Sequence, residues 1–325
     1  MKWILPIIAV ILLFAMELFL GSVSISMGEI WSVLTGNSND DVNEIIIKQS
    51  RLPRAVVASM SGAGLALCGL LMQRFFQNPL AGPSVLGITS GASLGVALVI
   101  MAGGAFLGSW GVIGGAFMGA MVVLLLIILF STRSVSPTTL LIFGLMVGYL
   151  VGALVTILQF GSTKESLRSF VFWGMGSFAD RSWVETGVLS LVVFIGAALT
   201  FLLHRQLDLW SLGEEYARSM GLNHQRFRIY ILVLTGMMTG VITAYCGPIA
   251  FLGLAVPHLA RGLWSSGRHR VLVPAVMITG MIVALGCDLI SRLPGTEGGL
   301  PLNAVTSFLG APVVIAIILK GRRVF

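Results

Sequence analysis

The stretch FLGSWGVIGGAFMGAMVVLLLIILF, residues 106–130, carries no charged side chain and decides the fold class of the chain. A helix needs about 20 mostly apolar residues to cross the hydrocarbon core of a bilayer, and this stretch is long enough. The whole chain has the same character, because 56% of its 325 residues are apolar and only 10% are charged. An ordinary soluble domain has roughly 25% charged residues. The composition therefore predicts an all-α polytopic membrane protein.

Ten segments meet the same requirement, so we expect about ten transmembrane helices in a compact bundle that forms a single domain over residues 1–325. The expected spans are 3–21, 54–75, 84–103, 106–130, 138–160, 184–203, 226–246, 249–265, 271–291 and 301–319. The first follows Lys2 as a signal peptide would, but it is long, contains Glu17 and precedes no small-residue cleavage site. Gly247-Pro248 and Pro257-His258 interrupt the stretch 226–265, where we expect a short or broken helix.

The basic residues predict the orientation. With the N-terminus in the cytosol, thirteen of the twenty Lys and Arg residues fall in inner segments, and Asp208, Glu214 and Glu215 are the acidic residues there. This bias follows the positive-inside rule, so we expect both termini in the cytosol. A net charge of +7 could also indicate nucleic-acid binding, but the basic residues lie in short stretches between apolar runs, which is typical of membrane topology.

Glycine recurs every four residues in several expected spans. The rows are Gly87, Gly91 and Gly95; Gly111, Gly115 and Gly119; Gly144, Gly148 and Gly152; and the pair Gly236 and Gly240. Such rows let helix backbones approach closely in lipid, where little else drives association. They predict a compact bundle.

Groups that catalysis or ion coupling would need are scarce. The acidic residues Glu17 and Asp288 fall within expected spans, both towards the outer end. Asp288 precedes Arg292 by four residues, so we expect an ion pair on one helix face. The three cysteines lie far apart in apolar segments and the histidines are scattered, so neither disulfides nor a metal site is predicted. No Gly-Lys step of a P-loop occurs, so we expect no catalytic function and no cofactor on this chain, and any ATP would bind another subunit.

The longest inner loop, residues 204–228, contains the signals of a short helix at about 212–220. In chain order, these are a capping box at Ser211–Glu214, acidic Glu215, basic Arg218 near the end and Gly221 as the left-handed terminator. The helix is too short and too polar to span. It could simply order the loop, or it could dock into a groove on a cytosolic motor.

The segment SLGEEYARSMGLN at 211–223 resembles the cytosolic loop of FecCD-type permeases, which belong to ATP-driven importers of iron-siderophores, haem and cobalamin. Four further stretches resemble the same family in the same order. They are RLPR at 51–54, GLLMQRFFQNPLAGPSVLGITSGASLG at 69–95, GPIAFLGLAVPHLAR at 247–261 and LPLNAVTSFLGAP at 300–312. The resemblance extends from about residue 25 to the C-terminus, and five ordered motifs are far more specific than any one.

The resemblance implies the partners as well as the function. It implies a multi-pass subunit of the bacterial inner membrane that forms a homodimer around a translocation path, with membrane lipid around it and no nucleic acid. Two ATPase subunits would dock at the cytosolic face, and a periplasmic or lipoprotein substrate-binding protein would dock at the outer face. The family loop contacts the ATPase, and the matching residues here are Leu212, Glu214, Glu215, Arg218 and Gly221.

Three arginines are expected at the outer ends of spans, namely Arg51, Arg54 and Arg292. Family binding proteins present carboxylates to arginines at matching places, and arginine suits bidentate carboxylate recognition. The alternative is interfacial anchoring, in which a basic side chain reaches the lipid headgroups.

Four residues are candidates for the cytosolic gate of the path: Asn78, Leu80, Thr138 and Thr139. Family residues near these positions narrow the cytosolic exit. Asn78 and Thr139 could equally be helix-boundary residues, because Asn-Pro favours a turn.

The chain departs from the family pattern before the last span. Many relatives have Glu followed by an apolar residue, Pro, Val and Gly, whereas here Gly298-Gly299 separates Glu297 from Leu300-Pro301. The competing function is a gradient-driven secondary transporter, which would have buried acidic coupling residues and inverted halves. The sequence does not distinguish iron-siderophore, haem and cobalamin as the chelate.

Overall fold

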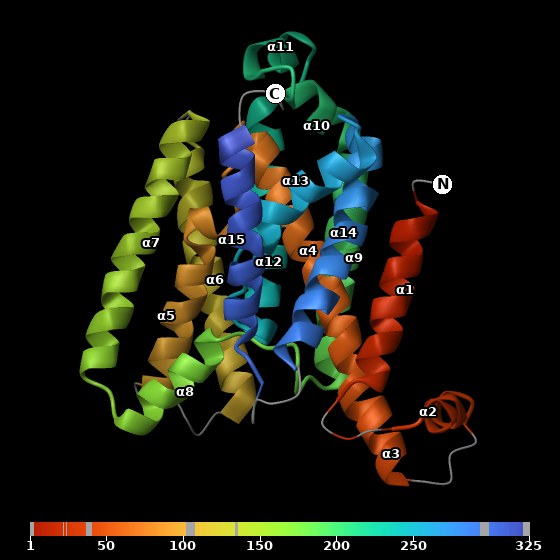
Figure 1. Ribbon diagram of the computed structural model, residues 1–325. Helices are drawn as coiled ribbons and strands as arrows, with labels where there is room; N and C mark the ends of the chain where they lie inside the picture. Colours follow the sequence, from red (N-terminus) through yellow and green to blue (C-terminus); the bar gives the residue numbers. More distant parts are fainter. Residues whose placement is uncertain are drawn as a thin grey trace.

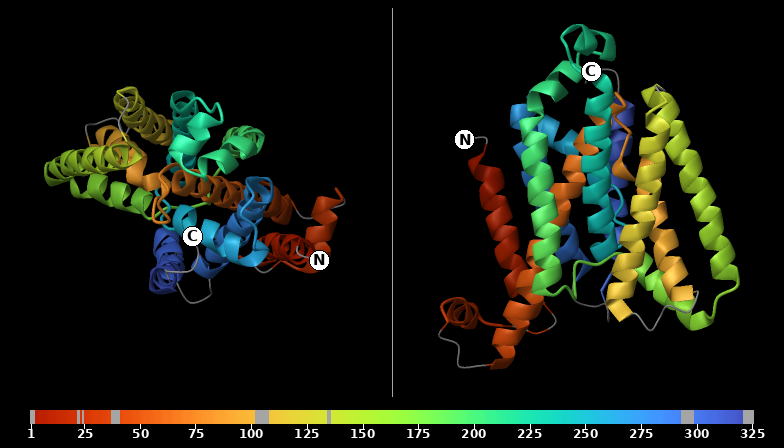
Figure 2. Two further views of the ribbon diagram at one scale, coloured as in Figure 1. Left: turned by 90° about the horizontal axis from the view of Figure 1, so that it is seen from above. Right: turned by 180° about the vertical axis from the view of Figure 1, so that it is seen from behind.

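The regular structure of this chain is helical. The computed structural model describes residues 3–21, 23, 25–36, 41–101, 108–133, 136–292 and 299–320, and these ranges contain no strand. The helices are, in chain order, α1 (Ile4–Phe19), α2 (Met27–Leu34), α3 (Asp41–Ile45), the π-helix η1 (Ile46–Arg51), α4 (Leu52–Phe75), the 3-10 helix η2 (Pro83–Leu86), α5 (Ile88–Met101), α6 (Gly108–Ser131), α7 (Pro137–Phe160), α8 (Lys164–Gly174), α9 (Trp183–Leu202), α10 (His204–Trp210), α11 (Glu214–Ser219), α12 (His224–Cys246), α13 (Leu252–Trp264), α14 (His269–Ser291) and α15 (Leu302–Lys320). The long helices run side by side as one bundle (Figures 1 and 2), which confirms the all-α prediction.

Six helices in the described ranges are long and apolar enough to cross a membrane. They are the continuous helix Asp41–Phe75, which joins α3, η1 and α4, together with α6, α7, α9, α12 and α14. Three shorter apolar helices, α1, α5 and α15, accompany them, and α13 is shorter still. The polytopic architecture is confirmed. Each of the ten expected spans contains one of these helices.

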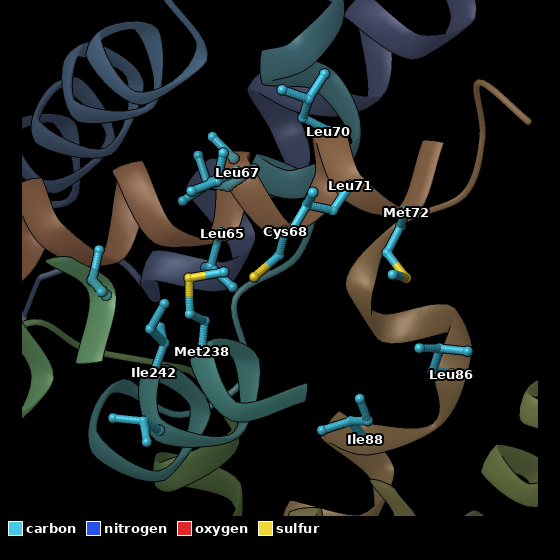
Figure 3. Close-up of a cluster of buried hydrophobic side chains, with 14 of the residues drawn as sticks. Leu65, Leu67, Cys68, Leu70, Leu71, Met72, Leu86, Ile88, Met238 and Ile242 are labelled. Atoms are coloured by element: carbon cyan, nitrogen blue, oxygen red, sulfur yellow. The ribbon is translucent and has the colours of Figure 1, made fainter. Parts of the chain in front are cut away.

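Helix α4 lies in the middle of the bundle. It packs against α14, α12, α13 and α9, and almost all its side chains from Val57 to Phe75 are buried. Figure 3 shows Leu65 and Cys68 of α4 gathered with Met238 and Ile242 of α12 in the apolar core. Buried small and apolar side chains on every face are typical of a helix surrounded by other helices.

Glycines bring α4 into backbone contact with two neighbours. A Cβ atom at Gly62 would overlap the carbonyl oxygen of Gly280 on α14. A Cβ atom at Gly69 would overlap that of Gly253 on α13. Neither pair belongs to the predicted glycine rows.

The predicted rows do hold α5 and α6 together. A Cβ atom at Gly91 would lie 2.5 Å from the carbonyl oxygen of Gly119, and Gly95 opposes Gly115 in the same way. The prediction of close packing is confirmed here. Gly152, by contrast, faces open space.

The structure corrects two expected boundaries. Residues 83–86 form η2, Gly87 takes a left-handed conformation with φ of 73°, and α5 begins only at Ile88. The break after α12 is confirmed, because residues 247–250 are not helical. The expected second break at Pro257 is wrong, since α13 continues through it to Trp264. Pro257 leaves the carbonyl oxygen of Gly253 without its helical donor, and Gly69 packs against that oxygen.

Several predicted features lie outside the described residues. They are the span ends expected at 102–103 and 106–107, the basic residues Lys2, Arg322 and Arg323, and the family departure at Glu297 and Gly298.

The two ends of the bundle carry different short helices. Helices α10 and α11 project from one end, which we call the α11 end, and α2, α3 and α8 lie at the other, which we call the α2 end (Figure 1). Helix α1 begins and α15 ends towards the α11 end. Helix α2 was not predicted. It begins with a capping box in which the Ser26 N–H donates to Glu29 Oε2 at 2.8 Å and the Glu29 N–H donates to Ser26 Oγ at 3.3 Å.

Candidate functional site

The segment expected as the inner loop, residues 204–228, contains two short helices, α10 and α11, and the start of α12 at His224. The predicted capping box is wrong, because the Ser211 hydroxyl donates back to the Leu207 carbonyl oxygen at 2.8 Å and closes α10. Gly213, with φ of 108°, precedes α11 instead. The expected helix therefore exists but begins at Glu214.

The predicted terminator of this helix is confirmed. Gly221 is left-handed, with φ of 86°. Its N–H donates to the Arg218 carbonyl oxygen at 3.0 Å, and the Leu222 N–H donates to that of Ala217 at 3.0 Å. These two bonds form a Schellman motif, which glycine favours because it has no Cβ.

Three large apolar side chains of this segment are uncovered at the tip of the α11 end. Leu212, Tyr216 and Met220 are exposed by 63%, 51% and 58% and recur every four residues. Glu215 and Arg218 are exposed beside them, whereas Ala217 is buried. Exposed apolar patches with polar rims are typical of protein–protein or membrane interaction sites.

Helix α10 anchors this tip to the bundle. The Trp210 indole N–H donates to the Phe75 carbonyl oxygen at 3.1 Å, and its ring stacks on Phe75 with centroids 5.8 Å apart. Asp208 Oδ1 accepts the backbone N–H of His269 at 2.9 Å and the Nδ1–H of the same residue at 2.6 Å. The tip is thus tied to the last residue of α4 and the first residue of α14.

The first pair of gate candidates lies directly after α4. Asn78 Oδ1 accepts the Leu80 backbone N–H at 2.9 Å, which makes the turn expected of a helix-boundary asparagine. His258 of α13 donates from Nε2 to the Pro79 carbonyl oxygen at 2.9 Å. Leu80 itself is 42% exposed. The loop is therefore held by α13 while one apolar side chain projects from it.

The second pair lies in the first turn of α7. Thr138 and Thr139 are exposed, and the Thr139 N–H donates to the Ser136 hydroxyl oxygen at 3.1 Å. Among the described residues, no hydrogen bond joins this pair to Asn78 or Leu80. Each pair thus makes its own local hydrogen bonds at the end of a helix.

Arg51 is buried near the α2 end, with 5% of its surface exposed. Its guanidinium donates to the carbonyl oxygens of Leu18 at 2.5 Å and Phe19 at 3.0 Å, and also to that of Val23. The Leu18 and Phe19 carbonyl groups belong to the last turn of α1, where the helix leaves them without intrahelical donors, and Val23 lies beyond its end. Arg51 therefore fixes the exit of the chain from α1.

Arg54 and Arg292 form one network with two carboxylates. Arg54 makes a bidentate pair with Asp288, with both N–O distances at 2.8 Å. Arg292 pairs with Asp288 at 3.2 Å, which confirms the predicted ion pair, and also with Glu17. Both carboxylates are buried, and the arginine side chains are 20% and 15% exposed. The network joins α1, α4 and α14.

Three further polar contacts, like the pairing of Arg54 with Asp288, were not predicted from the sequence. Glu185 is a buried acid at the start of α9. It forms a capping box with Ser182, the N-cap residue of this helix, and it pairs with Arg181 at 4.0 Å. Arg261 on α13 donates to Gln73 on α4. The third is the bond between Asp208 and His269. The residues in two of these contacts lie far apart in the chain, and those of the third lie at the edge of an expected span. The hydrophobic periodicity of the sequence therefore does not indicate any of the three.

The described residues contain neither a disulfide nor a cluster of potential metal ligands. Cys68, Cys246 and Cys287 are buried free thiols, as small apolar packing predicts. No group of three His, Cys, Asp or Glu side chains there could hold a metal ion.

Comparisons with known proteins identify the family. The model of the FecCD transport family matches residues 8–320. The vitamin B12 import system permease protein BtuC of Klebsiella pneumoniae is 37% identical over 302 residues, which cover 92% of this chain and 90% of the relative. The protein of the same name from Salmonella typhimurium is 34% identical over 326 residues, or 99% and 96% of the two chains.

Solved structures agree with this assignment. An inward-facing metal-chelate-type ABC transporter is 31% identical, covers 97% of both chains and superposes with a TM-score of 0.85. PsaBC of Streptococcus pneumoniae, at 14% identity and a TM-score of 0.57, covers 90% of this chain and shares the fold. The gradient-driven alternative is not favoured by these matches. The chain belongs to the FecCD transport family and is a permease subunit of an ABC importer.

Proposed function

We propose that the chain carries a bulky metal chelate across the bacterial cytoplasmic membrane, and that a cobalamin is the substrate to test first. The observation that supports this most directly is 37% identity over 302 residues to a permease named for vitamin B12 import. Iron-siderophores and haem belong to the same broad class of metal chelates and are the competing substrates. ATP is bound and hydrolysed by partner subunits, and this chain is the non-catalytic path.

We propose a single transmembrane domain of ten spans, with both termini in the cytosol. Each expected span contains a helix. The short apolar helices α1, α5, α13 and α15 cross the membrane as parts of the bundle. Neighbouring helices there supply hydrogen-bond partners for the backbone groups that a short or broken helix leaves free. The α11 end is the cytosolic end, in accord with the basic residues of the inner segments.

At the cytosolic end, we propose that α11 docks on the ATPase. The exposed Leu212 would enter a groove of the partner together with Tyr216 and Met220. Glu214, Glu215 and Arg218 would give the contact its charge pattern, and Gly221 would fix the helix end. Trp210 and Asp208 then connect a displacement of α11 to α4 and α14.

At the outer end, we propose that a substrate-binding protein presents carboxylates to Arg54 and Arg292. Both arginines are partly exposed, so an incoming carboxylate would bind the exposed edge of each guanidinium while Asp288 and Glu17 keep their buried contacts. Arg51, being buried, would support this surface by fixing the end of α1.

We propose that two copies of the chain line the path and that the gate residues face each other across the dimer. Asn78 and Leu80 follow α4 and Thr138 and Thr139 begin α7, and these ends of α4 and α7 lie towards the α11 end (Figure 1). A second copy would place the same four residues on the opposite side of the path.

The test is ATP-dependent uptake of cobalamin into proteoliposomes that contain the chain, its ATPase and its binding protein. We expect uptake with ATP and none with an ion gradient alone. Glu214→Arg should reduce uptake at least tenfold while the dimer persists, because a cation replaces an anion at the docking surface. Glu165→Arg, on α8 at the opposite end, is the matched control. Uptake driven by a gradient without ATP would contradict the proposal.

A further inference from the structure

An apolar groove lies between α1 and α2 at the α2 end. It has a volume of about 530 Å³, within the roughly 300–1,000 Å³ typical of small-molecule sites. The lining residues are Ala15, Leu18 and Phe19 from α1 and Met27, Gly28, Ile30 and Trp31 from α2. None of them carries a charge, so the groove suits an apolar ligand.

The groove continues a row of exposed side chains along α1. Ile4, Ile8 and Ile11 are exposed by 59%, 45% and 61%, and their spacing of four and three residues places them on one helix face. The same spacing leads to Ala15 and Leu18, which line the groove. In a bilayer this row contacts acyl chains. An acyl chain that follows it outwards reaches the space beneath α2.

Helix α2 has the orientation and the side-chain distribution of a helix that lies in the membrane interface. It lies crosswise to α1 both in Figure 1 and in the view from above in Figure 2. Ile30 and Val33 are buried, whereas Met27 and Trp31 are exposed by 72% and 70%. An amphipathic helix with a free tryptophan ring is typical of the headgroup level of a membrane.

Gly28 keeps one wall of the groove open. A Cβ atom at this position would meet no heavy atom within 4 Å. The residue lies in the first turn of α2, and the helix itself would accept almost any larger side chain more readily than glycine. The space above Gly28 is therefore available to a ligand.

We propose that this groove binds an acyl chain of one membrane phospholipid, held between α1 and α2 with Trp31 at the headgroup level. A lipid is the occupant because the groove is continuous with the lipid-facing row of α1. The site depends only on membrane insertion, so it stands or falls independently of the transported substrate.

The first test fills the groove. We would purify the complete importer with Gly28→Leu and, as the matched control, with Gly187→Leu, which replaces an exposed α9 glycine that also faces open space. Phospholipid retained per chain after the same detergent wash would be quantified by mass spectrometry. We expect Gly28→Leu to retain one phospholipid fewer than the unaltered chain and the control. Equal retention in all three would overturn the proposal.

The second test identifies the occupant. A photoreactive phenylalanine analogue at position 31 would be activated in intact membranes, and the mass of the adduct would be measured. We expect a phospholipid adduct that is at least several-fold weaker when Gly28→Leu is also present. An adduct with a second copy of the chain or with a substrate-binding protein would contradict the lipid site.

Discussion

Neutralising Asp288 should destabilise the bundle by far more than the loss of an ordinary ion pair. Its side chain is 1% exposed, and it holds Arg54 through two bonds of 2.8 Å and Arg292 at 3.2 Å. Asp288→Asn preserves the shape of the side chain but removes the charge. Arg54 would then lose its carboxylate partner, and Arg292 would keep only Glu17.

The magnitude follows from burial. Removing one partner of a buried ion pair costs about 3–5 kcal/mol, because the other charge is left uncompensated. The arginine side chains are 20% and 15% exposed, so water compensates them in part. We therefore expect a loss of about 3 kcal/mol, or roughly two orders of magnitude in the unfolding equilibrium.

The assay is reversible unfolding by SDS in mixed micelles, with Arg54→Gln and the double variant completing a cycle. We expect a coupling energy of about 1–3 kcal/mol between the two sites, as for residues in one network. The control is Glu44→Gln, which removes the Lys48–Glu44 pair, whose side chains are 45% and 38% exposed. That loss should be about 0.5 kcal/mol or less.

Two results would refute this reasoning. One is an Asp288→Asn loss no larger than that of the Glu44→Gln control. The other is additive loss in the cycle, which would mean that Arg54 and Asp288 do not interact in the membrane-embedded protein.

Three further substitutions test the contacts that position the proposed site. Gly280→Ala should cost about 1–3 kcal/mol, because its methyl group meets the Gly62 carbonyl oxygen and forces α4 and α14 apart, whereas Gly152→Ala should leave the SDS midpoint unchanged. Trp210→Phe should cost about 1–3 kcal/mol, since it keeps most of the ring contact but leaves the carbonyl oxygen at the end of α4 without its donor; an unchanged midpoint would contradict the 3.1 Å bond. Asp208→Asn should lower the ratio of transport to ATP hydrolysis at least threefold, because it weakens the link from α10 to α14, and an unaltered ratio would show that coupling runs elsewhere.

Much of the fold follows from local sequence. An apolar run such as 106–130 can satisfy its backbone in lipid only as a helix, so its structure is predictable without knowing its neighbours. The packing of α5 on α6 follows from Gly91 and Gly119, whose rows are visible in the sequence. Gly221 ends α11 because its backbone conformation strongly favours glycine.

Contacts between distant residues could not be predicted in this way. Arg54 and Asp288 are 234 positions apart, and the sequence around either residue does not indicate that the other is its partner. Ser211 shows a different limit, because its hydroxyl could cap the next helix or close the previous one. The presence of α10, which has no apolar signal of its own, decided the outcome. Helix α2 was not predicted because its eight residues have neither the length nor the hydrophobicity of a span, although Ser26 and Glu29 have the spacing of a capping box.

We expect this permease to work with a separate ATPase. Native mass spectrometry of the complex, gently solubilised from its own cells, detects that partner if it is present. We predict an assembly of two copies of this chain with two copies of an ATPase, and the same measurement on Glu214→Arg should show the two chains without the motor. A chain that is found alone or as a bare dimer, under conditions that preserve known importer complexes, would contradict the account.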